Sequence, residues 1–193
     1  MLPCYVVLDL ETTGGSPQRD RVTEIAAVRI EGSQEVARWS TLINPESPIP
    51  FFIQSLTGIS DRMVQDAPIF ATVVPRLIEL LDGAVLVAHN ASFDHGFLLG
   101  EFGRLQADLC VKTLCTVRLS RALYPQHRSH SLDAIMRRHG LNSNARHRAM
   151  GDVDVVLEWL TMATLEHGME KVRRHASKLV KGFPPPRRHA DIV

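Results

Sequence analysis

Residues 5–14 read YVVLDLETTG, an apolar strand that ends in two acids, and this stretch decides the fold. Side chains alternate between the two faces of a strand, so Asp9 and Glu11 share one face while Leu8 and Leu10 share the other. Taken alone, an acid pair that closes a strand is more often a solvated edge than a metal site. Here the apolar run continues into acids and not into a turn, which favours a shared cation.

The rest of the chain predicts further strands and several helices. Strands are expected at 5–10, 22–30 and 35–43, and the short links between them favour antiparallel pairing. A loop with three prolines fills 44–60, followed by a helical stretch to about Asp82 that Pro75 must kink or start afresh. A strand at 84–90 feeds a helix at 91–105, and more helices are predicted at 114–123, 131–139 and 148–166. This order indicates an α/β fold with a mixed sheet flanked by helices.

Composition favours one soluble domain. The chain has 193 residues and is 45% hydrophobic, which suffices for one core. It has no apolar run of 18 residues, and its N-terminus lacks the features of a signal peptide, so we expect a cytoplasmic protein with no membrane association. Cys4, Cys110 and Cys115 do not match a zinc pattern, and their surroundings give no reason for a reactive thiolate.

Charge is distributed unevenly along the chain. Residues 171–193 hold seven of the 22 basic residues and one of the 21 acids, so residues 1–170 have 15 basic against 20 acidic residues and a net charge of −5. Charge therefore argues for nucleic-acid binding only in the tail. We expect one domain over 1–168, followed at 169–193 by a basic, proline-containing helix end and a tail or linker.

Two more acids and a histidine complete the candidate set. Asp94 follows the strand at 84–90, with Ser92 as the expected N-cap, and on its own it would be read as a helix-dipole contact. Asp152 lies beside the apolar stripe of the last predicted helix and so faces inward. His147 is one of nine histidines and on its own would be structural or exposed. Four inward acids need a cation, and oxygen ligands favour Mg²⁺ or Mn²⁺.

Three segments together resemble the exonuclease motifs of the DEDDh (DnaQ-like) family, which includes the proofreading epsilon subunit of the bacterial replicative polymerase. The three segments are YVVLDLETTG, AHNASFD and the H-x4-D of HRAMGD. Two further stretches, LTGI and HSLDAIMRRHGL, also match, so the resemblance covers about residues 3 to 165. It implies a ribonuclease-H-like fold with a mixed five-stranded sheet. It also implies 3′→5′ removal of nucleotides with two Mg²⁺ or Mn²⁺ ions, which can stabilise the attacking and the leaving oxygen.

The resemblance also implies a role for each site residue. Asp9 would bridge the two metal ions, Glu11 and Asp152 would hold the ion that binds the attacking water, and Asp94 would support the other. His147 would be the general base, since the usual histidine pKa of about 6.5 suits proton removal at neutral pH. Thr12 and Thr13 would contact the terminal nucleotide, and Leu56 and Phe93 would pack on its base, although Phe93 also fits the core stripe of its helix.

The leading hypothesis is an exonuclease acting on single-stranded DNA or on frayed 3′ ends, in proofreading or repair. One alternative is an exoribonuclease of the ribonuclease T or oligoribonuclease type, because the same metal ligands serve both sugars. Another is a nuclease module that its basic tail tethers to a DNA polymerase or repair protein. Pure tethering would predict loss of the metal ligands, and all four acids are present.

Overall fold

A five-stranded sheet of order β3-β2-β1-β4-β5 forms the centre of the computed structural model, which describes residues 1–143 and 146–182. The strands are β1 (Cys4–Thr12), β2 (Val22–Glu31), β3 (Gln34–Leu42), β4 (Val85–Ala88) and β5 (Lys112–Cys115). β1, β2 and β3 pair antiparallel, whereas β4 runs parallel to β1 and β5 runs parallel to β4. This is the predicted mixed five-stranded sheet of a ribonuclease-H-like fold.

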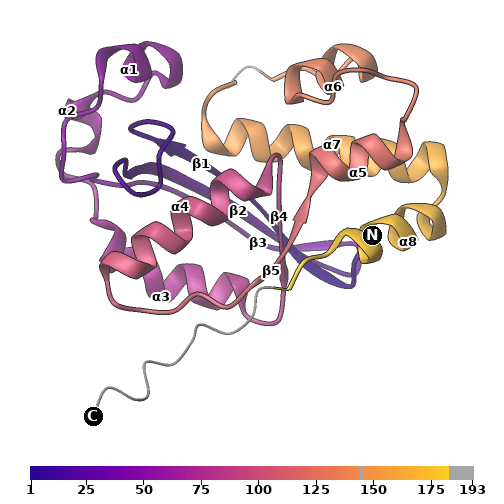
Figure 1. Ribbon diagram of the computed structural model, residues 1–193, viewed down its shortest axis with the longest axis horizontal. Coiled ribbons are helices and arrows are strands. Elements are labelled where there is room, and N and C mark those ends of the chain that lie inside the picture. The colour runs from indigo at the N-terminus through magenta and orange to yellow at the C-terminus, as the bar shows by residue number, and fades with distance from the viewer. Residues whose placement is uncertain (144–145, 183–193) are drawn as a thin grey trace.

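Helices cover both faces of this sheet, as Figure 1 shows. Those on one face are α3 (Phe70–Leu81) and α4 (Ala91–Arg104), which pack on the inward side chains Val6, Leu8 and Leu10 of β1. The other face packs against α5 (Thr116–Leu123), α6 (Leu132–His139), α7 (Ala149–His167) and α8 (Met169–Leu179). Two small helices, α1 (Phe51–Thr57) and α2 (Asp61–Val64), surround a third apolar cluster.

Three predictions about secondary structure were wrong. Residues 112–115 form β5, so the helix expected from 114 begins at Thr116. The proline-containing loop at 44–60 contains α1, whose first residue directly follows Pro50. The helical stretch expected up to about Asp82 is interrupted between Val64, where α2 ends, and Phe70, where α3 begins. Helix α3 continues through Pro75, so no helix starts afresh there, and the alternative of a kink at Pro75 stays a prediction.

Helix α8 packs onto the body and is not part of a free tail. Its Val172 and Ala176 are fully buried in the same cluster as α5 and α7, and residue Lys181 pairs with Thr113 of β5. The predicted division at 168/169 stays a prediction, and residues 183–193 of the predicted tail lie outside the described residues. No helix in the described ranges has both the length and the hydropathy needed to cross a membrane.

Candidate active site

Three of the four predicted acids meet where β1 ends. Asp9 and Glu11 come from β1, and Asp152 comes from the first turn of α7, which packs on β1 and β2. Each contributes a carboxylate oxygen, and these oxygens lie within 4.8 Å of one another. As predicted, Asp152 is buried while Asp154 is half exposed and pairs instead with Arg38. The group has the ligand type and spacing that a hard divalent cation requires.

Asp94 reaches the same region from α4 but is not within that close group. It is almost fully buried, and backbone amides of Leu10 and of Asp94 itself are hydrogen-bonded to its carboxylate. The predicted N-cap, Ser92, was wrong: Asn90 is the cap residue, in the left-handed conformation with φ of 74°, and Ser92 lies in the first turn. The cap shift leaves Asp94 in the first turn, facing the carboxyl end of β1.

Burial and mutual repulsion make these acids resist ionisation. Burial, followed by the charges of Asp94, Asp152 and Glu11, raises the pKa of Asp9 well above its ordinary value. The pKa of Glu11 rises to about 7, first through burial and then through Asp152 and Glu24. Burial raises the pKa of Asp94 to about 8 although its backbone hydrogen bonds oppose the shift. Without a cation, the site therefore keeps protons at neutral pH that a bound cation would displace.

Arg146 supplies positive charge to this acid group. Its guanidinium donates a short hydrogen bond to Asp152 and a second, of 2.9 Å, to Asp133 at the start of α6. The same charge opposes the upward pKa shifts of Asp9 and Glu11. Arg146 thus partly neutralises the carboxylate that a metal ion would also bind. Sequence reasoning missed this residue, which directly precedes His147.

Glu24 fixes the start of α7, and sequence reasoning missed it as well. It lies opposite Glu11 in the β1–β2 register and is only 5% exposed. Its carboxylate accepts hydrogen bonds from Arg148, the closest of 2.6 Å, and from the backbone amide of Ala149 at 2.9 Å. This amide is one of the free donors at the helix N-terminus. Glu24 therefore ties β2 to the segment that carries Asp152.

The predicted general base, His147, lies in the turn that precedes α7 and is partly exposed. Its backbone has φ of 60°, which is uncommon for a residue with a side chain. His89 and His95, which flank Asp94 in the sequence, are the next candidates for the general base, but their surroundings are unsuitable. Nδ1 of His89 lies 2.9 Å from Oγ1 of Thr116, and burial lowers the pKa of His89 to about 4. His95 is buried, and burial lowers its pKa too.

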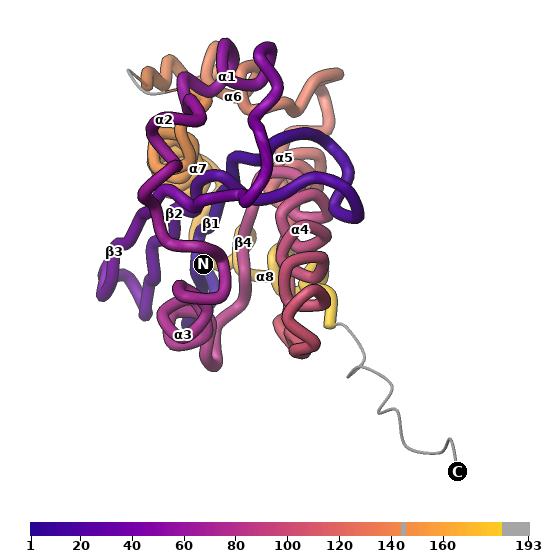
Figure 2. Tube along the Cα trace, turned by 90° about the vertical axis from the view of Figure 1, so that its left-hand side faces the viewer, coloured from indigo at the N-terminus to yellow at the C-terminus, as the bar shows by residue number. Residues whose placement is uncertain are grey.

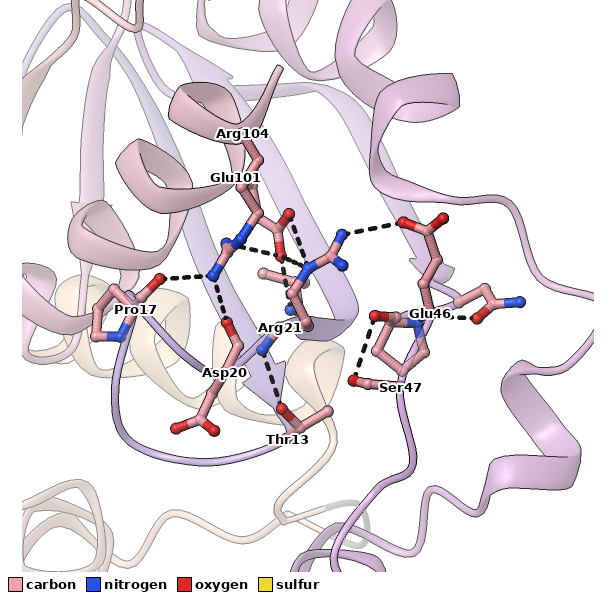
Figure 3. Close-up of polar contacts among 11 residues, drawn as sticks. Thr13, Pro17, Asp20, Arg21, Glu46, Ser47, Glu101 and Arg104 are labelled. Atoms are coloured by element: carbon pink, nitrogen blue, oxygen red, sulfur yellow. Dashed lines mark hydrogen bonds and ion pairs between the residues drawn. The ribbon is translucent and has the colours of Figure 1, made fainter. Parts of the chain in front are cut away.

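An ion-pair network holds the loop that follows the β1 acids, as Figure 3 shows. Thr12 and Thr13 are buried, and the Thr13 hydroxyl accepts a 2.9 Å hydrogen bond from the backbone amide of Arg21. The Arg21 side chain donates to the buried Glu101 of α4 at 2.9 Å and to Glu46 at 3.2 Å. Of the two threonines predicted to contact substrate, Thr12 therefore ends β1 and Thr13 begins a loop that is braced against the helix of Asp94.

The two predicted base-packing residues differ in their environment. Leu56 is 53% exposed on α1, a position open to a ligand. Phe93, in the first turn of α4, is partly buried against the core, and the centroid of its ring lies 4.8 Å from that of Phe97. Phe93 therefore packs in the core, which was the alternative that the sequence allowed. Its contact with a base stays a prediction.

A mixed sheet with carboxylates gathered at the end of its central strand is the arrangement of a ribonuclease-H-like, metal-dependent nuclease. The family model RNase_T, described as exonuclease, matches residues 6–160. The chain therefore belongs to this exonuclease family, and its domain is a 3′→5′ exonuclease domain of the DEDDh type.

Individual relatives agree with this assignment. DNA polymerase III PolC-type of Caldanaerobacter subterraneus subsp. tengcongensis is 40% identical over 154 residues, which cover 80% of this chain and 11% of that protein. The 3′-5′ exonuclease DinG of Bacillus subtilis is 42% identical over 154 residues, 78% of this chain and 16% of that protein. The chain thus matches a small part of each. Exonuclease X, solved in complex with 5′ overhanging duplex DNA, aligns with a TM-score of 0.71 and 26% identity, covering 90% of this chain and 98% of that one.

Proposed function

We propose that the domain removes nucleotides from the 3′ end of single-stranded or frayed DNA, in proofreading or repair. The observation that carries this proposal is the meeting of the Asp9, Glu11 and Asp152 oxygens within 4.8 Å. DNA is favoured over RNA because Exonuclease X, a similar protein of known structure, was solved with overhanging duplex DNA. The similarity to part of PolC-type polymerases and of DinG supports a setting beside a polymerase or repair protein.

The donor set suits Mg²⁺ or Mn²⁺, two ions per site. Asp9 would face both ions, Glu11 and Asp152 would hold one, and Asp94, set slightly apart, would support the other. When bound, such ions activate water and stabilise the charge that develops on the phosphate oxygens. His147 would accept the proton of the attacking water, and Thr12, Thr13, Leu56 and Phe93 would position the terminal nucleotide. The free thiols of Cys4, Cys110 and Cys115 suit the reducing cytoplasm, where we place the protein.

Labelled oligonucleotides test this function directly. DNA and RNA strands of one sequence, labelled at the 5′ end, are incubated with Mg²⁺, with Mn²⁺ or with EDTA. We expect the DNA to shorten one nucleotide at a time with either metal and to stay intact in EDTA. Internal cleavage at the earliest time points would contradict an exonuclease. Faster shortening of the RNA would instead support the exoribonuclease alternative.

A further inference from the structure

Three cations from two distant parts of the sequence line one cavity beside α4. The cavity has a volume of about 270 Å³, and Arg118 and Arg121 of α5 and Lys181 line it together with Asn90 and Ser92. The two arginines are three residues apart on one helix and therefore neighbours on its surface. Lys181 is brought there by its backbone pairing with Thr113, through two hydrogen bonds of 2.9 Å. Figure 2 shows α4, α5 and α8 to the right of β4, on the side away from β3.

The three cations that line this cavity have no acidic partner in the described part of the chain. Arg21, Arg38 and Arg148 each pair with acids, whereas Arg118, Arg121 and Lys181 form no ion pair within residues 1–143 and 146–182. No acid lines the cavity. Residues 1–170 carry a net charge of −5, whereas the charged side chains that line this cavity are all basic. Like charges gathered around a cavity raise the local concentration of anions.

The cavity lies close to the carboxylates that define the active site. Ala88 of β4 is in register with Cys115 of β5, and β4 in turn runs parallel to β1. The carboxyl ends of the three strands thus lie at one edge of the sheet. Neighbouring strands are about 4.8 Å apart, so two strand spacings, roughly 10 Å, separate the line of β1 from that of β5. An extended nucleic-acid strand that ends at Asp9 can reach this distance within a few nucleotides.

We propose that this cavity binds backbone phosphates of the substrate strand, a few nucleotides on the 5′ side of the bond that is cut. This inference rests on the proposed function, because it takes the ligand to be a nucleic-acid strand. The arginines would bind phosphate oxygens, for which the planar guanidinium is well suited, and Asn90 and Ser92 would add hydrogen bonds. The contacts carry no sequence information, as an enzyme that shortens any strand requires.

The test measures binding without cleavage. Fluorescence anisotropy in EDTA gives the affinity for a 12-nucleotide and for a 2-nucleotide DNA strand between 50 and 300 mM KCl. The proteins compared are the parent, the cavity variant Arg118→Gln/Arg121→Gln and the control variant Lys171→Gln/Arg174→Gln. The last variant loses the same charge from exposed positions of α8 outside the cavity. For two lost phosphate contacts on a single strand, the slope of log affinity against log salt should become shallower by about 1.4.

We expect this change for the 12-nucleotide strand in the cavity variant, a much smaller one in the control variant, and none for the 2-nucleotide strand. Arg118→Lys/Arg121→Lys should restore most of the slope because the charges return. Equal slopes in cavity and control variants would overturn the proposal. The proposal would also be overturned if the cavity variant bound the 12-nucleotide strand as the parent does but no longer bound a nucleoside monophosphate. That result would show that the cavity binds the free product. A parent that binds with the expected slope but does not cleave would refute the proposed function alone.

Discussion

Replacing Glu11 by Gln should stabilise the metal-free protein while removing its activity. The pKa of Glu11 is raised from 4.5 to about 7, by burial first and then by Asp152 and Glu24. A shift of one pKa unit corresponds to about 1.4 kcal/mol, so ionising this carboxyl in the folded protein costs up to about 3 kcal/mol. Because the side chain is partly exposed, screening by solvent reduces this cost. The unfolded chain loses the proton near pH 4.5 and the folded chain near pH 7, so stability falls as pH rises through this window.

Urea denaturation in EDTA at pH 5, 6, 7 and 8 measures this effect. Parent and Glu11→Gln should have similar free energies of unfolding at pH 5, and by pH 8 the variant should be more stable by up to about 3 kcal/mol. Glu79→Gln, at an exposed position of α3, serves as the control. Added Mg²⁺ should stabilise both proteins at pH 8, because the ion binds only the folded state. The effect should be larger for the parent, because the variant lacks the Glu11 carboxylate that would hold the ion. A difference between parent and variant that does not change from pH 5 to pH 8 would refute the reasoning.

Three further substitutions test the other groups around the carboxylates. His147→Ala should lower the single-turnover rate at least about 100-fold while metal and DNA still bind, and a rate near that of the parent would exclude it as the base. Glu24→Gln should lower kcat about tenfold at nearly constant KM, since it loosens Arg148 and hence the α7 segment bearing Asp152; a change in KM alone would argue against positioning. Arg146→Ala should tighten Mn²⁺ binding in calorimetry, because the ion no longer competes for Asp152, and weaker binding would show that Arg146 supports the site.

Local patterns in the sequence predicted the central part of this fold well. The apolar run of β1 and the strand feeding α4 are confirmed, and so is the apolar stripe of the last predicted helix, which in α7 consists of the buried residues Val155, Val156, Trp159 and Leu160. The two strands are buried on both faces and the helix along one stripe, so packing fixes the spacing of their apolar residues. The family resemblance supplied the five-stranded sheet, which residue spacing alone left as a mixed sheet of undetermined size.

The errors concern elements whose structure depends on distant neighbours. β5 has only four residues, KTLC, without a clear alternation, and it exists because β4 pairs with it on one side and Lys181 bridges to it on the other. The helix α1 has seven residues and one well-buried apolar anchor, Ile53, in a small cluster of its own. Propensity over so short a window is weak, and tertiary contacts decide the outcome.

The same limit explains which site residues the sequence could reveal. Asp9 and Glu11 can be recognised from the sequence because they are acids in an apolar strand. Glu24 is only one polar position in β2, and its role can be seen only when the strand register is known. That register places Glu24 opposite Glu11, an arrangement of like charges that normally destabilises a sheet. Arg148 and the backbone amide of Ala149 stabilise the Glu24 carboxylate through hydrogen bonds, whereas Glu11 keeps a raised pKa of about 7. The structure therefore relieves one acid of the pair through the protein itself and leaves the other to bind a cation.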